Sequence, residues 1–415
     1  MLRDRLNRHR ELIGFSIVVI AYFTVLGMAL PLVPLLATDL GASPGMLGIL
    51  FSVATCGALF GAIPAGQMVT RLGSRTMIFF SVLLSGASCF FLFAAPTMTS
   101  LFIWYSLFEL GRSVFIVSSQ THAGGLPTTG DVSVNFGRYG VAAAVGQLLG
   151  PFAAGILMDT AGFHLTWLVM GVLCALICAA VYRLIGPGLQ VPARRRSQRP
   201  RTGGVKQHGD VRRQGAGKQH GNRQPSLRRF FSFYAVLGLV ASVIIVFTVG
   251  MRRVFYPIYV EQLGYTASAI GLMLSIRALT SVLARLFLMP ATRLLGGRLS
   301  TLVICMFALA IGLGTIPFCR NLTTLGLNSV LIGLGVGLAM PMSQATVFES
   351  VESSERGLAL GVRLTGNRLA QLTNPVLLGL LTECFGISVA FWAGGAILCL
   401  VALPVLIMLA RRNNR

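Results

Sequence analysis

The stretch that decides the fold is Gly137–Gly155, GRYGVAAAVGQLLGPFAAG, a long apolar segment with a proline near its end. Proline inside a helix removes a backbone hydrogen bond and clashes with the preceding turn, so soluble helices avoid it there. A helix in a membrane tolerates it, because neighbouring helices satisfy the freed backbone groups. Small residues at Gly146, Gly150 and Gly155 let another helix approach closely. The stretch therefore predicts a membrane-spanning helix that packs against others.

A second copy of this stretch lies at Gly361–Gly379, GVRLTGNRLAQLTNPVLLG. The offset between the copies, 361 − 137 = 224, also aligns Gln147, Leu148 and Pro151 with Gln371, Leu372 and Pro375. Earlier in the chain the offset is 223, and it aligns Pro34, Leu40, Gly41 and Gly48 with Pro257, Leu263, Gly264 and Gly271. Co-linear matches of this kind indicate a duplicated half-chain of about six helices, an arrangement common in secondary transporters.

The composition indicates a membrane protein. Hydrophobic residues make up 54% of the 415-residue chain and charged residues only 11%, whereas a soluble protein carries roughly a quarter charged residues. Uncharged runs recur along the chain, each near the ~20 residues that cross a bilayer. We expect an all-α integral membrane protein with twelve transmembrane helices in two pseudo-symmetric six-helix bundles, residues 1–185 and 230–415.

Residues 186–229 form the expected linker between the bundles, and this linker is strongly basic. It holds twelve lysines and arginines against Asp210 alone, a charge of 12 − 1 = +11 within a total of +22. Nucleic-acid-binding segments have such runs, but so do the cytoplasmic loops of membrane proteins. We interpret it as a cytoplasmic loop without a nucleic-acid partner. Most other loop arginines fall on the same side, so we expect a multi-pass protein of the plasma (inner) membrane with both termini cytoplasmic.

Twelve helices arranged as six plus six, with a long middle loop, resemble the major facilitator superfamily over essentially the whole chain. The most specific motif is Gly146-x-x-x-Gly150-Pro151-x-x-x-Gly155. It resembles the antiporter motif of drug:proton exchangers, although the usual final Gly-Gly is Ala154-Gly155 here. The resemblance implies a transporter that works by alternating access, and we expect neither a cofactor nor a metal.

The loop after the second expected helix resembles a second signature of that superfamily, Gly-x-x-x-Asp-Arg-x-Gly-Arg. Gly66, Arg71, Gly73 and Arg75 are in place, and Thr70 stands at the Asp position. In the family this Asp helps to latch the two halves together on the cytoplasmic side. The substitution therefore puts the usual latch of this chain in question.

Glu109 is the one acidic residue that we place near the middle of an expected span, and Arg112 follows it by three residues. An ionisable group at the bilayer centre is costly and usually lines a cavity. The spacing puts both side chains on one helix face, within pairing distance. Either they form a neutral structural pair, or Glu109 exchanges a proton while Arg112 gains or loses an anion. We name Glu109 as the candidate proton-coupling residue.

The second half of the chain carries arginines within its expected spans and no mid-span acid to balance them. An anion from outside the chain would balance them, and the guanidinium fork suits a carboxylate or a phosphate. The alternative is that arginines reach the lipid headgroups, which we consider for Arg285 and for Arg252 and Arg253 near a helix end. The candidate substrate ligands are Arg112, Arg277, Arg363, Asn367, Arg368, Gln371 and Gln147.

Three functions remain open from the sequence. The first is proton-coupled export of a small organic anion, such as a drug, a metabolite or a carboxylate siderophore, by a monomer. The second is proton-coupled uptake of an organic anion by symport. The third is a non-transporting sensor or scaffold on a transporter fold. An enzyme is not expected, because the sequence has no Walker A loop, no Gly-x-Ser-x-Gly and no His-Glu-x-x-His motif. The expected partners are the small-molecule substrate, protons and the lipid bilayer.

Overall fold

The computed structural model describes residues 2–126, 133–185, 233–350 and 356–413. Within these ranges the chain is helical and forms no strand. The predicted linker, residues 186–229, lies outside the described residues, and the division into domains at its two ends stays a prediction. The helices of the first half are α1 (Leu2–Asp39), α2 (Pro44–Leu72), α3 (Ser74–Ala94), α4 (Met98–Gly125) and α5 (Ser133–Leu184).

The second half repeats this succession of helices, with one short helix added. The elements are α7 (Phe233–Gln262), α8 (Ala267–Leu286), α9 (Leu288–Leu294), α10 (Arg298–Gly314), the 3-10 turn η1 (Ile316–Phe318), α11 (Leu322–Glu349), α12 (Arg356–Phe385) and α13 (Ile387–Asn413). The added short helix is α9. The chain bends by 96° between α9 and α10, so the two are separate helices.

The number of spans agrees with the predicted twelve. By length and composition, the described part of the chain has nine helices that could cross a membrane, or ten if the bent pair α9–α10 is one span. One of them, α5, contains two crossings, because Gly162 has φ 76° and ψ 176° and interrupts the helix. The remaining long helix, α12, is more polar than the others because of its arginines and amides. The sum is 10 + 1 + 1 = 12, which confirms the predicted all-α architecture.

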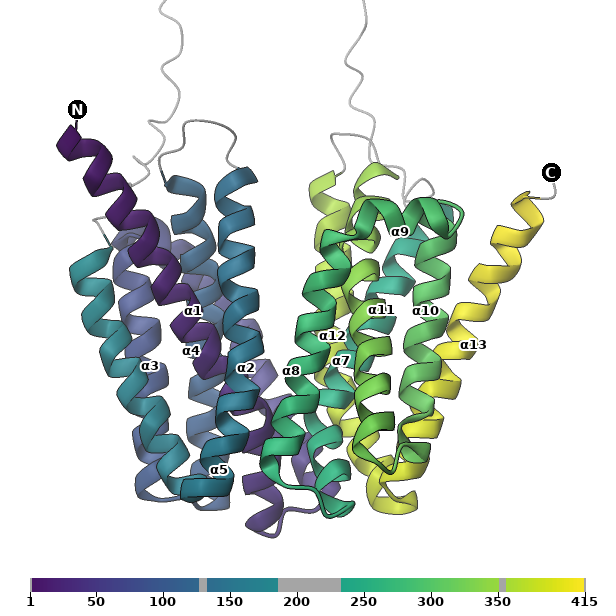
Figure 1. The fold of residues 1–415 in the computed structure, drawn as a ribbon, viewed down its shortest axis with the longest axis horizontal. Coiled ribbons are helices and arrows are strands. Elements are labelled where there is room, and N and C mark those ends of the chain that lie inside the picture. Colours follow the sequence, from purple (N-terminus) through teal and green to yellow (C-terminus); the bar gives the residue numbers. More distant parts are fainter. Residues whose placement is uncertain (1, 127–132, 186–232, 351–355, 414–415) are drawn as a thin grey trace, which may run out of the picture.

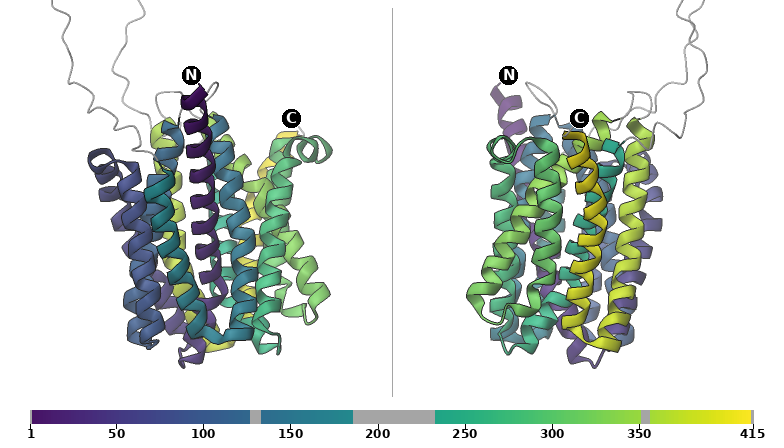
Figure 2. Two further views of the ribbon diagram at one scale, coloured as in Figure 1. Left: turned by 60° about the vertical axis from the view of Figure 1, so that its left-hand side comes forward. Right: turned by 90° about the vertical axis from the view of Figure 1, so that its right-hand side faces the viewer.

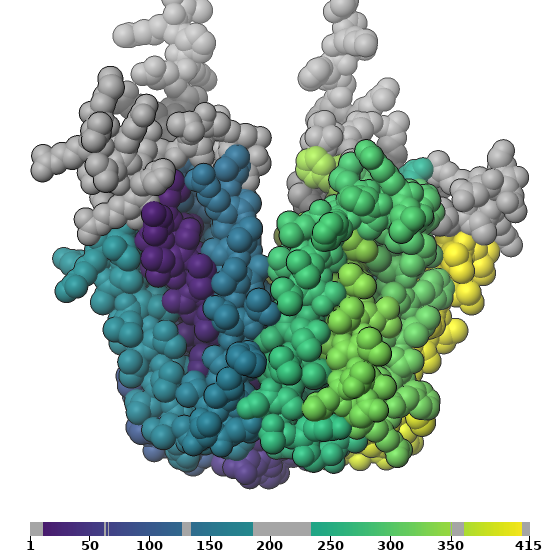
Figure 3. Space-filling model, viewed as in Figure 1, coloured from purple at the N-terminus to yellow at the C-terminus, as the bar shows by residue number. Residues whose placement is uncertain are grey.

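The helices form two bundles that lie side by side, α1–α5 and α7–α13 (Figure 1). Both chain termini lie at the same end of the molecule, here called the termini end (Figure 2). At the opposite end, here called the far end, the bundles touch, and the groove between them widens toward the termini end (Figure 3). The structure is therefore closed at the far end and open at the termini end.

Two helix pairs join the bundles, and the sequence repeat relates one pair to the other. Helix α5 packs on α8, and α2 packs on α12. Ser275 of α8 donates a hydrogen bond to the carbonyl of Leu148 at 2.7 Å, and Ser52 of α2 donates one to the carbonyl of Leu372 at 2.7 Å. The offsets are 275 − 52 = 223 and 372 − 148 = 224, the two offsets found in the sequence. The two interfaces are thus pseudo-symmetric copies.

The glycines of the motif in α5 allow these close approaches. A Cβ atom added at Gly146 or Gly150 would lie 2.4 Å from a backbone oxygen of α1, and one added at Gly155 would lie 2.4 Å from a backbone oxygen of α8. The first two glycines therefore hold α5 against its own bundle, and the third holds it against the other bundle. Pro151 lies between them, and its carbonyl would lie 2.2 Å from a Cβ at Gly271 of α8.

The Gly150→Ala substitution is expected to destabilise the protein by about 1–3 kcal/mol, because the added methyl group overpacks a backbone-to-backbone contact. Gly140 is the matched control on the same helix, since a Cβ there has nothing within 4 Å. Thermal unfolding of the detergent-solubilised variants measures the difference. Equal midpoints for both variants would contradict the packing role of Gly150.

Candidate substrate and proton site

Glu109 is the centre of a charged cluster between the bundles. It is 1% exposed on α4. The guanidinium of Arg112, one turn along the same helix, donates to Glu109 Oε2 from Nε at 2.6 Å, and its Nη2 also lies 2.6 Å away. The hydroxyl of Tyr105 donates to Glu109 Oε1 at 3.3 Å. The predicted pair of Glu109 and Arg112 is present, but it is part of a larger arrangement.

Arg253 of α7 supplies the contact from the other bundle. Its Nη2 forms an ion pair with Glu109 Oε1 and donates to the Tyr105 hydroxyl at 2.8 Å. The guanidinium also lies over the ring of Phe51, 5.6 Å from its centroid. Arg253 therefore binds the acid of the first half instead of reaching the headgroups. Arg253 was not among the candidate site residues predicted from the sequence. The available signal was the dipeptide Arg252-Arg253, because adjacent helical residues face different sides and both cannot reach lipid headgroups along one face.

Arg368 of α12 adds a further cation to this cluster. It interacts electrostatically with both Arg112 and Glu109, and it donates a hydrogen bond to Gln371 Oε1 at 3.2 Å. The three arginines and the one acid carry a formal charge of 3 − 1 = +2. Because the side chains come from α4, α7 and α12, the cluster joins both halves of the molecule. It is here called the central cluster: Tyr105, Glu109, Arg112, Arg253, Arg368 and Gln371.

Two other polar side chains of α12, Arg363 and Asn367, contact helices of the second bundle. Arg363 is 4% exposed and donates to Ser343 Oγ of α11 at 3.2 Å. Asn367 accepts a hydrogen bond from Ser242 of α7 at 2.6 Å. The candidate ligands on α12 therefore divide. Arg363 and Asn367 contact neighbouring helices of their own bundle, and Arg368, which is hydrogen-bonded to Gln371, interacts with Arg112 and Glu109.

Two further arginines of the second bundle have no acidic partner among the described residues. Arg252 is 2% exposed and binds Asn328 Oδ1 at 3.2 Å and Ser329 Oγ at 3.0 Å. Its guanidinium lies 4.0 Å from the centroid of the Tyr256 ring, so it too is buried and not at the headgroups. Arg277 is partly buried on α8, makes no hydrogen bond with the described part of the chain and interacts electrostatically with Arg252. The assignment of Arg277 as a candidate ligand for an anion stays a prediction.

The residues of the two sequence motifs lie outside the central cluster. Gln147 is exposed on α5. Gly73, with φ 86°, ends α2 and precedes α3, and an L side chain would be strained there. Arg75 donates to the Tyr182 carbonyl and lies 5.4 Å from the centroid of its ring, a contact within the first bundle. Arg71 is exposed in the last turn of α2, and a Cβ at Gly66 meets no atom within 4 Å.

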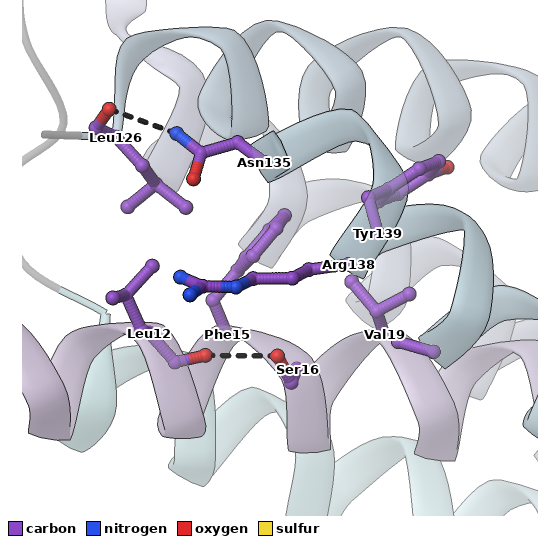
Figure 4. A pocket seen from close by; sticks show the side chains of 9 residues that line it. Leu12, Phe15, Ser16, Val19, Leu126, Asn135, Arg138 and Tyr139 are labelled. Atoms are coloured by element: carbon purple, nitrogen blue, oxygen red, sulfur yellow. Dashed lines mark hydrogen bonds between the residues drawn. The ribbon is translucent and has the colours of Figure 1, made fainter. Parts of the chain in front are cut away.

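A small hollow between α1 and α5 is separate from these residues. Figure 4 shows Arg138 extending across it from α5, with Leu12 and Ser16 of α1 on the other side. Asn135 donates a hydrogen bond to the carbonyl of Leu126 at 2.9 Å. The cavity has a volume of about 10 Å³, about the room for one water molecule. It is too small to hold a substrate.

The chain matches the family model described as Major Facilitator Superfamily over residues 15–252 and 238–415. It is 28% identical over 152 residues to the multi-drug resistance efflux pump PmrA of Streptococcus pneumoniae serotype 4 (strain ATCC BAA-334 / TIGR4), which covers 36% of this chain and 38% of that protein. That match therefore spans less than half of the relative. The chain is also 25% identical over 398 residues to the tetracycline resistance protein, class C, of Escherichia coli, and this match covers 92% of each chain.

A solved structure with the same arrangement is that of the nucleoside transporter NupG. Its TM-score is 0.72, with 12% identity and coverage of 96% of this chain and 99% of that one. At this identity the likeness shows the fold alone. The named relatives are transport and resistance proteins, which agrees with the expectation that the chain is not an enzyme. The family model covers both halves of the chain, and the chain belongs to the Major Facilitator Superfamily.

Proposed function

We propose that the protein is a secondary transporter that exports a small organic anion in exchange for protons, by alternating access. The observation that carries the proposal is the central cluster, in which one acid is shared by arginines of both bundles. An acid in that position can take up and release a proton, and the arginines can take up an anion. The charge of +2 favours a substrate with two acidic groups, such as a dicarboxylate or a phosphate ester.

The coupling follows from the contacts of Glu109. With the far end closed, Glu109 is a carboxylate held by Arg112 and Arg253. The ion pair with Arg253 joins the bundles, so a rearrangement that opens the far end would strain or break it. A carboxylate that loses a cationic partner binds a proton more readily. Protons would then enter from the far end and leave when the two arginines pair with Glu109 again.

The export direction is proposed from the relatives and from the glycine motif in α5. The names of the two relatives are those of an efflux pump and a resistance protein. The motif resembles that of drug:proton exchangers, and its glycines lie at the helix contacts described above. We further propose that both termini face the cytoplasm, that the protein lies in the plasma (inner) membrane, and that it works as a monomer.

Proton-coupled uptake is the second candidate. It is favoured by the way in which anion binding to the central cluster would affect Glu109. An anion that binds Arg112 or Arg253 takes a cation away from Glu109. The proton and the anion would then favour each other's binding, as a symporter requires. In an exchanger the proton and the anion must bind in alternation. The anion would then bind Arg368 and Gln371, and Glu109 would keep its ion pairs with Arg112 and Arg253.

Transport into membrane vesicles separates the two directions. Inside-out vesicles are energised to an acidic interior and given a panel of radiolabelled mono-, di- and tricarboxylates. If the protein exports, a gradient-dependent accumulation of the anion is expected there, together with a loss of the proton gradient on its addition. Accumulation confined to right-side-out vesicles with an acidic exterior would establish uptake instead. Vesicles from cells without the protein provide the background.

A further inference from the structure

Two carboxylates at the far end each bind the beginning of a helix in the other bundle. Asp159 of α5 accepts hydrogen bonds from the backbone N–H of Ala267 at 2.9 Å and of Ser268 at 2.8 Å, the first two residues of α8. Glu383 of α12 accepts one from the backbone N–H of Gly45, the second residue of α2, at 3.0 Å. Backbone N–H groups at a helix start lack partners in their own helix and attract negative charge.

These two contacts are copies of each other within the sequence repeat. The offset between the two acids is 383 − 159 = 224, and the offset between the two helix starts is 268 − 45 = 223. The number of backbone donors differs for a simple reason: the first residue of α2 is Pro44, which has no N–H to donate, so Glu383 has one backbone donor where Asp159 has two. The described residues therefore carry the same interaction twice, once on each side of the pseudo-symmetry axis.

A pair of acidic side chains at the far end acts in the opposite direction. Glu261 near the end of α7 interacts electrostatically with Asp39 at the end of α1, in the other bundle, and also hydrogen-bonds the side chain of Thr38 in α1, a contact that a glutamine at position 261 could keep. Both side chains are exposed carboxylates of the same sign. Their repulsion disfavours a closed far end, whereas the contacts of Asp159 and Glu383 favour it. The contacts of Asp159 and Glu383 thus add to the packing of α5 on α8 and of α2 on α12, and the repulsion between Asp39 and Glu261 acts against them.

We propose that Asp159 and Glu383 form a paired clamp that keeps the far end closed and must release for the protein to open toward that side. Each contact disappears when the bundles part, because acid and helix start belong to different bundles. Both side chains are exposed, so water can take over their hydrogen bonds and the clamp can open. The repulsion between Asp39 and Glu261 offsets part of the stability that the clamp gives to the closed state.

The proposal rests on alternating access, but it does not depend on the substrate, on the proton or on the direction of transport. A charge at a helix start at an exposed site is worth a modest factor in an equilibrium constant. We therefore expect each neutralisation to change the ratio of open to closed far ends by about twofold to fivefold. The two sites lie in separate interfaces, so the factors multiply to roughly fourfold to 25-fold in the double variant.

The test measures the distance across the far end in the full-length protein in nanodiscs, without substrate and without a gradient. Fluorophores on non-natural residues at Ala95 and Arg320, which lie in the loops before α4 and α11, leave the native cysteines unchanged. Single-molecule energy transfer then gives the open and closed populations. Asp159→Asn and Glu383→Gln are each expected to raise the open fraction, and Glu261→Gln is expected to lower it.

Two further variants separate the clamp from a general loss of structure. A Cβ at Gly45 would lie 2.0 Å from Glu383 Oε2, so Gly45→Ala displaces this carboxylate without changing any charge and should reproduce Glu383→Gln. Glu11→Gln alters an acid in the N-terminal part of α1, near the termini end, and should leave the distance unchanged. An unaltered open fraction in the Asp159→Asn, Glu383→Gln double variant would overturn the proposal. If the double variant opens as expected while the unaltered protein carries none of the anions in the vesicle assay, the proposed function is refuted and the clamp stands.

Discussion

Replacing Glu109 with glutamine is expected to abolish proton-driven accumulation of substrate and to leave exchange of labelled for unlabelled substrate intact. Glutamine keeps the shape and the hydrogen-bonding capacity of the side chain but cannot bind or release a proton. The carboxylate is buried and forms ion pairs with Arg112 and Arg253. No other acid among the described residues forms an ion pair with these arginines, so none can replace it as the proton-binding group. We expect the driven rate to fall by about a hundredfold or more, since coupling requires the titratable group.

The exchange activity of the variant serves as its own folding control. Removing one partner of a buried ion pair leaves an uncompensated charge and destabilises a protein, so the comparison has to be made at equal amounts of folded transporter. Glu11→Gln is the matched control, because Glu11 is an acid of the same bundle whose carboxylate lies 3.9 Å from His122 Nε2, away from the central cluster. Driven accumulation that persists in Glu109→Gln would reduce Glu109 to a structural partner of the arginines.

Replacing Arg368 with alanine is expected to lower the affinity for the anion by about a hundredfold. Arg368 interacts electrostatically with Arg112 and Glu109 of the central cluster but has no ion pair with an acid among the described residues. Among the three arginines of the central cluster, its charge is therefore the one most available to a ligand. Truncating one partner of a buried charge pair costs about 2–5 kcal/mol of binding free energy, which brackets this factor. Isothermal titration with the anion identified in vesicles measures it.

Arg363 provides the matched control on the same helix. It is buried against α11 and donates to Ser343, so Arg363→Ala should lower the thermal stability and change the affinity by no more than about threefold, since it removes a contact away from the ligand. Arg368→Lys should recover part of the affinity, because lysine keeps the charge and loses the fork. An affinity that is unchanged in Arg368→Ala, or lost equally in Arg363→Ala, would reject the assignment of the anion site.

The arrangement of the helices was predictable because the sequence contains the same pattern twice, once in each half. The two sequence offsets, 224 and 223, are also the offsets of the inter-bundle contacts of Ser52 and Ser275. The apolar runs predict the spans, since crossing a bilayer needs a length and a composition that a linear sequence displays. The pair of Glu109 and Arg112 was predictable for a related reason: residues three apart on one helix are neighbours whatever the rest of the fold does.

The partners across helices were decided by the tertiary structure. Arg253 binds Glu109 from 144 residues away, and nothing in the local pattern of α7 names that acid. The polar stripe of α12 shows that this helix has a polar face, but the rotation of the helix in its bundle decides that Arg363 meets α11 while Arg368 meets the central cluster.

From the sequence alone came the membrane-spanning helices, their two-fold repetition and the acid–arginine pair within one helix, because backbone hydrogen bonding and helical periodicity act over a few residues. Only the folded chain revealed the sharing of Glu109 between bundles and the binding of Asp159 and Glu383 to opposite helix starts. Those contacts depend on how whole helices are rotated and placed against one another. That placement is the outcome of packing over the entire molecule, and no short stretch of residues records it.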